Sequence, residues 1–119
     1  MDRRIELVIA RIKNETAVAW DTPTLAGLVN LSPSRFRHLF KKETGKGPVQ
    51  YLRELRLRKA EKMLRTTFLT VKQVAKQVGI HSNAHFVHDF RKLYGMTPTA
   101  YRRTTFGMLQ NRKRRKKKH

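Results

Sequence analysis

The side chains best suited to chemistry in this chain are cationic, imidazole and hydroxyl groups on two short segments. In the first, a helix drawn at about 100° per residue from an inward Phe36 places Ser34, Arg37, His38 and Lys41 on the outer face. A guanidinium can fork onto guanine O6 and N7, and small side chains can meet a thymine methyl in the major groove. This carboxylate-free face therefore indicates DNA recognition, and the plainer alternative is a solvated helix surface.

A second segment, fifty residues later, repeats the arrangement with a less basic face. Taking Phe86 as inward places Phe90 and Leu93 inside and His85 at the margin. The outer face then carries Ala84, Val87, His88 and Arg91. Because the same placement recurs in both segments, groove recognition is favoured over two merely solvated surfaces.

Other constellations of polar residues do not support catalysis or a metal centre. His81, His85 and His88 have no cysteine partner, and Asp89 is the only nearby carboxylate, so their spacing does not complete a metal site. Neither a Ser-His-Asp arrangement nor a glycine-rich phosphate motif occurs. Five glutamates are expected to pair with surrounding cations: Glu6, Glu15, Glu43, Glu54 and Glu61. We therefore expect no enzymatic activity, no metal and no cofactor.

Both segments belong to a repeat that runs through most of the chain. At an offset of fifty, Phe36, Phe40, Gly45, Pro48 and Tyr51 recur as Phe86, Phe90, Gly95, Pro98 and Tyr101. Upstream, at an offset of forty-nine, Ala26, Val29 and Leu31 recur as Ala75, Val78 and Ile80. The second copy thus has one extra residue in its turn. Apolar, glycine and proline positions repeated in this order predict two helix-turn-helix units.

Net charge restricts the partners of such a fold. Among 119 residues, 28 lysines and arginines stand against 8 carboxylates, for a formal charge of +20. Without the basic run at residues 112–118, 21 cations against 8 acids still leave +13. A charge of this size predicts a polyanionic partner, with nucleic acid first and an anionic membrane surface second. The run itself fits a solvated tail or a phosphate-contacting arm better than a membrane patch, because no amphipathic anchor accompanies it.

Targeting signals are absent from the sequence. The longest apolar run, residues 25–29, is far too short for a membrane span, and the N-terminus lacks the apolar core of a signal peptide. The absence of cysteine excludes disulfides and fits a reducing compartment. We expect a cytoplasmic protein with no membrane association.

Helical signals predict an all-α fold of about seven helices. Residues 3–14 form an amphipathic first helix, and a hydroxyl followed by proline at Thr22 and Ser32 starts the next two. Gly45 ends the third helix, and Pro48 opens the fourth and longest. The expected starts of the remaining helices are Thr70, Ser82 and Pro98. The expected buried side of the second helix is Leu25, Ala26, Leu28 and Val29.

These elements predict two lobes joined by a linker. The first helix-turn-helix lobe spans residues 1–47, the linker helix 48–66, the second lobe 67–110, and a disordered basic tail 111–119. Cations at positions 53, 56, 58, 59 and 62 of the linker are expected to face outward or to bridge to a polyanion.

A family resemblance rests on the same residues. The stretch from Val78 to Lys92, with Gly95-Met96-Thr97-Pro98 and Tyr101-Arg102 after it, resembles the signature of the AraC/XylS family. Leu31-Ser32-Pro33 through Gly45, with Tyr51-Leu52, resembles the first helix-turn-helix of that family, so the likeness covers residues 3–104. It implies two helix-turn-helix lobes joined by a long helix, each placing one helix in successive major-groove turns.

The resemblance also implies which residues contact DNA. Base contacts are expected at Ser34, Arg37, His38, Ala84, His85 and His88. Phosphate contacts are expected from Ser32, Arg35, Lys41, Lys42, Ser82, Asn83, Arg91, Lys92 and Arg102. Two departures from the family pattern are Ile80, where an aromatic is usual, and histidine in place of arginine at His38 and His88.

The expected function is that of a transcription regulator that binds double-stranded DNA sequence-specifically, either alone or as part of a longer protein. A linker helix of about 25 Å could set the reading helices one DNA turn of about 34 Å apart, on an asymmetric site. The resemblance implies RNA polymerase as a further partner and a monomeric state for this chain. The alternatives are a non-specific basic nucleic-acid-binding protein and, third, a membrane-active cationic protein.

Overall fold

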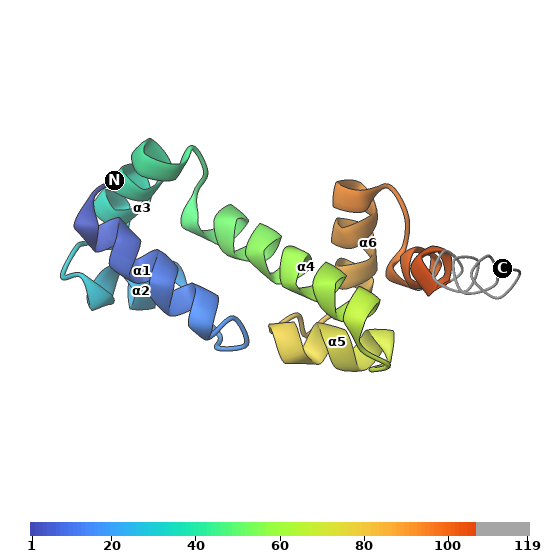
Figure 1. Ribbon diagram of the computed structural model, residues 1–119. Helices are drawn as coiled ribbons and strands as arrows, with labels where there is room; N and C mark the ends of the chain where they lie inside the picture. The colour runs from blue at the N-terminus through green and yellow to red at the C-terminus, as the bar shows by residue number, and fades with distance from the viewer. Residues whose placement is uncertain (107–119) are drawn as a thin grey trace, which may run out of the picture. The chain divides into compact units, whose positions relative to one another are not determined.

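Seven helical segments make up the fold in the computed structural model, which describes residues 1–106 and has no strand in that range (Figure 1). Six are α1 (Arg3–Asn14), α2 (Thr22–Leu28), α3 (Pro33–Thr44), α4 (Pro48–Thr66), α5 (Val71–Val78) and α6 (Asn83–Tyr94). The seventh is described over residues 98–106. The all-α prediction is confirmed. The predicted tail at 111–119 lies outside the described residues.

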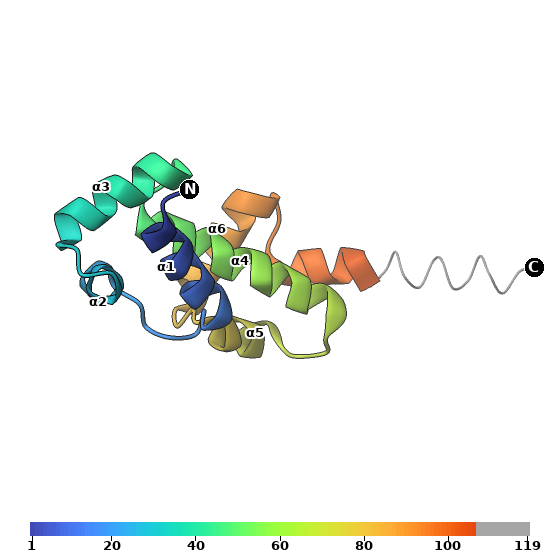
Figure 2. The same cartoon turned by 60° about the vertical axis from the view of Figure 1, so that its left-hand side comes forward.

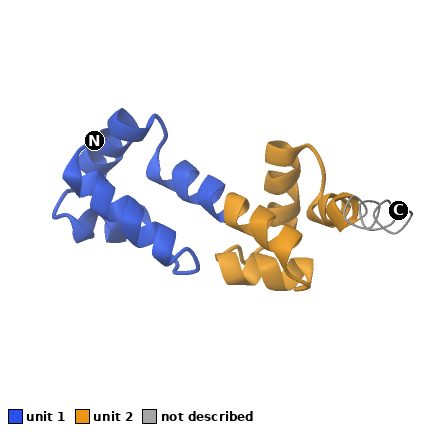
Figure 3. Cartoon of the chain, viewed as in Figure 1, with its two compact units in different colours: residues 1–56 blue, residues 57–119 orange. Residues whose placement is uncertain are grey.

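Two compact units share α4, one spanning Met1–Arg56 and the other beginning at Leu57 (Figure 3). The N-terminal half of α4 contributes Leu52 to the first core, and its C-terminal half contributes Leu57, Ala60 and Leu64 to the second. The predicted linker helix is therefore also a packing element of both units.

In the first unit, α1, α2 and α3 lie together (Figure 2), and the rings of Phe36 and Phe40 on α3 are completely buried. The amphipathic α1 contributes Ile5, Val8, Ile9 and Ile12 to this core. The indole of Trp20 packs against it, and the Trp20 Nε1–H donates to the Glu15 carbonyl at 2.8 Å. Burying aromatic and branched side chains in this way fixes which face of α3 remains outside.

The second unit repeats this packing around Phe86 and Phe90, which are also completely buried. The ring centroids of Phe40 and Tyr51 lie 5.3 Å apart, and those of the repeated pair Phe90 and Tyr101 lie 5.5 Å apart, both edge to face. Gly45 (φ 83°) and its repeat Gly95 (φ 80°) both end a helix in the left-handed conformation that favours glycine. The sequence repeat is therefore a structural repeat.

The extra residue of the second copy can be located from the turn hydrogen bonds. Leu31 N–H donates to the Ala26 carbonyl, and Ile80 N–H donates to the Ala75 carbonyl, so the offset is still forty-nine there. The serine caps that follow, at positions 32 and 82, are already fifty apart. The additional residue is therefore His81.

Three details of the predicted helices were wrong. The cap of α2 is Asp21, whose carboxylate accepts from Thr24 N–H at 2.8 Å, so Thr22 lies inside the helix. Leu28 is 45% exposed, because the following Val29 and Leu31 fill the core instead. Leu93 is 43% exposed, because Tyr94 packs its ring 4.6 Å from that of Phe90.

Candidate nucleic-acid interface

Capping and burial determine the orientation of α3. The Ser32 Oγ accepts from Arg35 N–H at 3.2 Å, Pro33 follows as the first helical residue, and the helix stops at Gly45. Because Phe36 and Phe40 face the core, the opposite face is exposed. The predicted contact residues on this exposed face are Ser34, Arg35, Arg37, His38, Lys41 and Lys42.

Capping and burial orient α6 in the same way. The Ser82 Oγ accepts from His85 N–H at 3.3 Å, and Phe86 and Phe90 face the second core. The predicted contact residues exposed on α6 are Asn83, Ala84, His85, His88, Arg91 and Lys92. The side chain of Val87, predicted to be outside, is only partly exposed. All six expected base-reading positions thus lie on exposed faces.

Each cap serine combines two properties. A hydroxyl oxygen that accepts from a backbone N–H keeps its own O–H as a donor. Ser32 and Ser82 therefore keep a donor at the N-terminus of their helices, where the partial positive charge favours an anion. This chemistry is compatible with the phosphate contacts expected of both serines.

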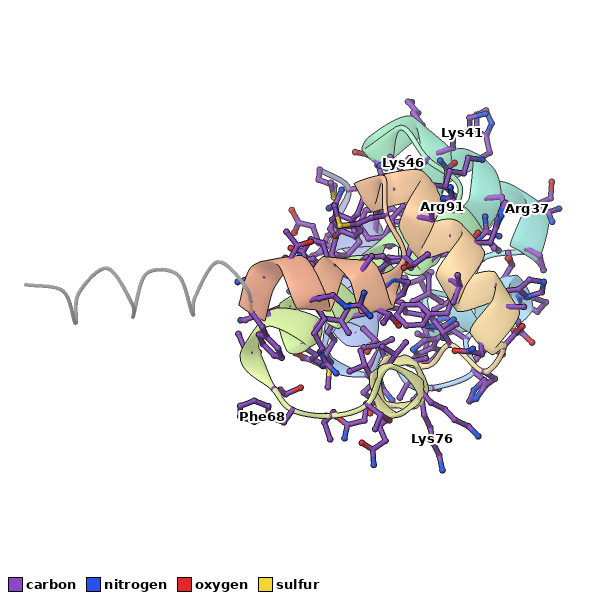
Figure 4. All side chains as sticks on the ribbon, turned by 90° about the vertical axis from the view of Figure 1, so that its right-hand side faces the viewer. Arg37, Lys41, Lys46, Phe68, Lys76 and Arg91 are labelled. Atoms are coloured by element: carbon purple, nitrogen blue, oxygen red, sulfur yellow. The ribbon has the colours of Figure 1, made fainter. Side chains whose placement is uncertain are left out.

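Basic side chains dominate the exposed face of α3, and Arg37 and Lys41 project from that helix in Figure 4. Four carboxylates elsewhere form ion pairs: Asp2 with Arg4, Glu15 with Arg11, Glu54 with Lys46, and Glu61 with Arg65. These ion pairs lie outside both reading helices. The exposed face of α3 is therefore suited to a polyanion, whereas the face of α6 combines two cations with imidazole, amide and methyl groups.

Arg102 has a different role from the phosphate contact expected of it. Its Nε donates to the Leu64 carbonyl at 3.2 Å, its Nη2 to the Thr67 carbonyl at 3.4 Å, and its Nη1 to the Leu69 carbonyl. Burial lowers the pKa of Arg102 from its ordinary value. The guanidinium ties residues 98–106 to the end of α4 and to the loop after it, so we do not include Arg102 among the DNA contacts.

Arg56 corrects a second expectation in the same way. The sequence predicts that it faces outward or bridges to a polyanion, but its Nε donates to the Thr16 carbonyl at 2.9 Å and its Nη2 to the Val18 carbonyl at 2.8 Å. Burial lowers the pKa of Arg56. This arginine holds the loop between α1 and α2 against α4.

Two pockets border the helix-turn-helix units and include cations that sequence reasoning missed. The first, of about 380 Å³, is lined by Arg4, Leu31, Ser34, Arg35, His38 and Leu39. The second, of about 180 Å³, is lined by Lys72, Ala75, Lys76, Ile80, His81 and Asn83. Comparing the two repeats could have revealed Lys72 and Lys76. At an offset of forty-nine they stand where the first repeat has the uncharged Pro23 and Gly27.

Residues 1–106 contain neither a metal-binding cluster of side chains nor a membrane-spanning helix. That range holds no cluster of three or more histidine, cysteine or carboxylate side chains able to bind a metal ion. None of its helices has the length and apolarity needed to cross a membrane.

Comparison with known proteins identifies relatives of this arrangement. A family model described as a helix-turn-helix domain matches residues 25–104. The HTH-type transcriptional regulator GlxA of Rhizobium meliloti (strain 1021) is 36% identical over 93 residues, covering 76% of this chain and 29% of GlxA. GadX of Escherichia coli (strain K12) is 33% identical over 101 residues, covering 85% of this chain and 36% of GadX. The chain thus spans about a third of the length of these regulators.

Solved structures share the fold. The DNA-binding domain of AdpA, a global transcriptional factor crystallised in complex with a target DNA, matches with a TM-score of 0.82 and 30% identity, over 85% of this chain and 91% of that one. A transcriptional regulator from Chromobacterium violaceum, one of the proteins that contain an AraC-type DNA-binding domain, matches with a TM-score of 0.79 and 25% identity. The match covers 87% of this chain and 92% of that one. With the family model matching well over half of its residues, this chain belongs to the AraC/XylS family of helix-turn-helix transcription regulators.

Proposed function

We propose that this chain reads double-stranded DNA sequence-specifically as part of a transcription regulator. The observation that carries the proposal is the repeated exposed face opposite buried phenylalanines, on α3 and again on α6. A helix held this way, with its N-terminal residues exposed, fits the recognition helix of a helix-turn-helix. The AdpA domain, which binds its own target DNA, supports the proposal by its similar fold.

The roles of the side chains follow from their chemistry. Arg37 is the residue on α3 best able to fork onto guanine, and His38 and Ser34 offer single hydrogen bonds beside it. On α6, Ala84 suits a thymine methyl, and His85 and His88 offer single hydrogen bonds. Contacts to the DNA phosphates come from exposed residues and from the partly buried Ser82: Ser32, Arg35, Lys41, Lys42, Ser82, Asn83, Arg91 and Lys92.

The test is base discrimination in an Arg37→Ala variant. A duplex recovered by selection from a random library, and all its single-base variants, are titrated with wild type and variant. We expect the variant to lose about 1–3 kcal/mol of discrimination at one base pair, as for a lost bidentate contact. Lys13→Ala on α1 removes the same charge from an exposed site and is expected to retain the discrimination.

Non-specific nucleic-acid binding is the second candidate, and the formal charge of +20 favours it. Phosphate contacts alone would give salt-sensitive binding with no preferred sequence. If Arg37→Ala weakened binding alike on every duplex and left base discrimination unchanged, this candidate would replace sequence-specific reading.

The cellular location, the protein partner and the oligomeric state are also proposed. By family we infer that the regulator works in the cytoplasm and contacts RNA polymerase, and that this chain alone is monomeric. The 19-residue α4 is about 28 Å long and contributes to both cores. By family we infer that the two reading helices enter successive major-groove turns. Sedimentation of the free chain as a stable dimer would overturn the monomeric state.

A further inference from the structure

A basic pocket lies beside the reading helix of the second unit. Lys72 and Lys76 stand on α5 one turn apart, and they line the pocket together with His81 of the turn and Asn83, the first residue of α6. The four side chains are exposed at the rim, Ala75 is buried and Ile80 is partly buried. Figure 4 shows Lys76 extending away from α5. The pocket thus combines an apolar floor with a cationic rim.

The corresponding positions on α2 of the first unit lack this cationic rim, although the pocket of that unit is lined by Arg4 and Arg35. At an offset of forty-nine, Lys72 and Lys76 correspond to Pro23 and Gly27 of α2, which carry no charge. His81 is the extra residue of the second turn and has no counterpart at all. The second repeat has therefore gained two cations and an imidazole at one place. The exposed face of α6 is itself less basic than that of α3.

The chemistry of the pocket suits a phosphodiester. Its lining contains two ammonium groups, an imidazole and an amide, and no carboxylate. An ammonium binds phosphate as a compact point charge, and the adjoining N-terminus of the twelve-residue α6 adds a partial positive charge. In helix-turn-helix proteins the first helix of the motif crosses the DNA backbone, and α5 is that helix here.

We propose that this pocket seats a backbone phosphate of duplex DNA, with Lys72 and Lys76 as additional phosphate contacts that the first unit does not make. The inference rests on the proposed DNA-binding function and adds that the two units contact the DNA backbone through different sets of elements. The first unit contacts DNA mainly through its reading helix, and the second is anchored through α5 as well.

The decisive variant is Lys72→Gln with Lys76→Gln. Each phosphate contact contributes close to one unit of slope to the dependence of log affinity on log salt, so the slope should fall by about two. Affinity should fall by a similar factor on every duplex, because phosphate contacts carry no sequence information. A variant with Lys72→Arg and Lys76→Arg keeps both charges and should retain the wild-type slope.

The matched control removes two charges elsewhere. Arg3 and Lys13 on α1 are exposed and lie outside the pocket, so Arg3→Gln with Lys13→Gln changes the net charge equally. We expect a smaller change of slope from this pair. Single methylphosphonates placed along the selected duplex provide a second readout. One that weakens wild type but not the Lys72→Gln, Lys76→Gln protein would mark the seated phosphate.

Equal slopes for the pocket and control variants, with no phosphate position that distinguishes them, would overturn the pocket as a seat. If wild type enriched no sequence, the proposed function would fail first, so the two failures are distinguishable. Glutamine keeps a good helix propensity at both exposed positions, and circular dichroism checks folding. If the double variant were unfolded, Lys72→Gln and Lys76→Gln would be measured singly, each with an expected loss of about one unit of slope.

Discussion

Arginine residues in this chain serve two purposes that sequence alone does not separate. Arg37 stands on an exposed helix face, whereas Arg56 and Arg102 use their forks to hold backbone carbonyls. The carbonyls bonded by Arg102 belong to residues 33 to 38 positions away in the chain. No local sequence pattern reveals such distant partners. The sequence therefore predicted base contact for Arg37, an outward or polyanion-bridging position for Arg56, and phosphate contact for Arg102.

Replacing Arg102 tests its structural role. In Arg102→Gln, three carbonyls lose a charged donor, and we expect the free energy of unfolding in urea to fall by about 1–3 kcal/mol. Arg103→Gln, at the exposed neighbouring position, should change it by less than about 0.5 kcal/mol. The salt slope of DNA binding should stay unchanged in Arg102→Gln, and a loss of one unit with unaltered stability would restore Arg102 as a phosphate contact.

Glu61 links stability to pH. Burial raises the pKa of this carboxyl, but hydrogen bonds from Arg65 and from the Tyr101 hydroxyl outweigh burial, so the net pKa lies below the ordinary 4.5. A lowered folded-state pKa contributes stability above the unfolded value, and that stability disappears as pH falls through the folded value.

The expected result follows from that sign. Glu61→Gln should be less stable than wild type at neutral pH, and the difference should narrow as pH falls below about 4.5. Tyr101→Phe removes one of the two residues that donate hydrogen bonds to Glu61 and should give an intermediate pH dependence. Urea unfolding between neutral pH and pH 3 measures both. A constant gap between wild type and Glu61→Gln at all pH values would contradict this account.

At the scale of elements, the helices could be predicted closely because their start and stop signals are local. Ser32, Thr70 and Ser82 cap their helices as expected, Gly45 and Gly95 end theirs, and the repeated aromatics lie in the cores. Asp21 displaced Thr22 as a cap because its carboxylate reaches Thr24 N–H from one residue earlier. Which of two adjacent residues becomes the cap depends on their backbone angles, and these cannot be determined from the sequence.

The helix stops provide an element-scale prediction. A Cβ on Gly45 or Gly95 would meet no heavy atom within 4 Å, so alanine there would be strained only by the positive φ. We expect Gly45→Ala and Gly95→Ala each to lower the free energy of unfolding by about 1–2 kcal/mol. Gly27→Ala is the matched control, because Gly27 lies inside α2 with equally open surroundings and should stabilise by up to about 1 kcal/mol. Equal effects at the three sites in thermal or urea unfolding would exclude backbone strain as the cause.

At the scale of the whole molecule, the two units are similar in fold but unequal in surface. Both cores use the same repeated aromatics, but α3 is more basic than α6, and only α5 carries the two pocket lysines. The exposure of all six proposed reading positions could be predicted, because helical periodicity and buried phenylalanines decide it. The pocket lined by Lys72 and Lys76 could not be predicted, because it forms only where α5, the turn and α6 meet in the folded chain. Because the reading faces of the two units differ, we expect them to bind an asymmetric DNA site.

The most direct test of sequence-specific reading is selection of bound duplexes from a random library, with heparin present to suppress the charge term. The account predicts enrichment of one directional motif with two blocks about one helical turn apart. Tight, salt-sensitive binding without any enriched motif would contradict it, and would reduce the exposed faces of α3 and α6 to a general polyanion surface.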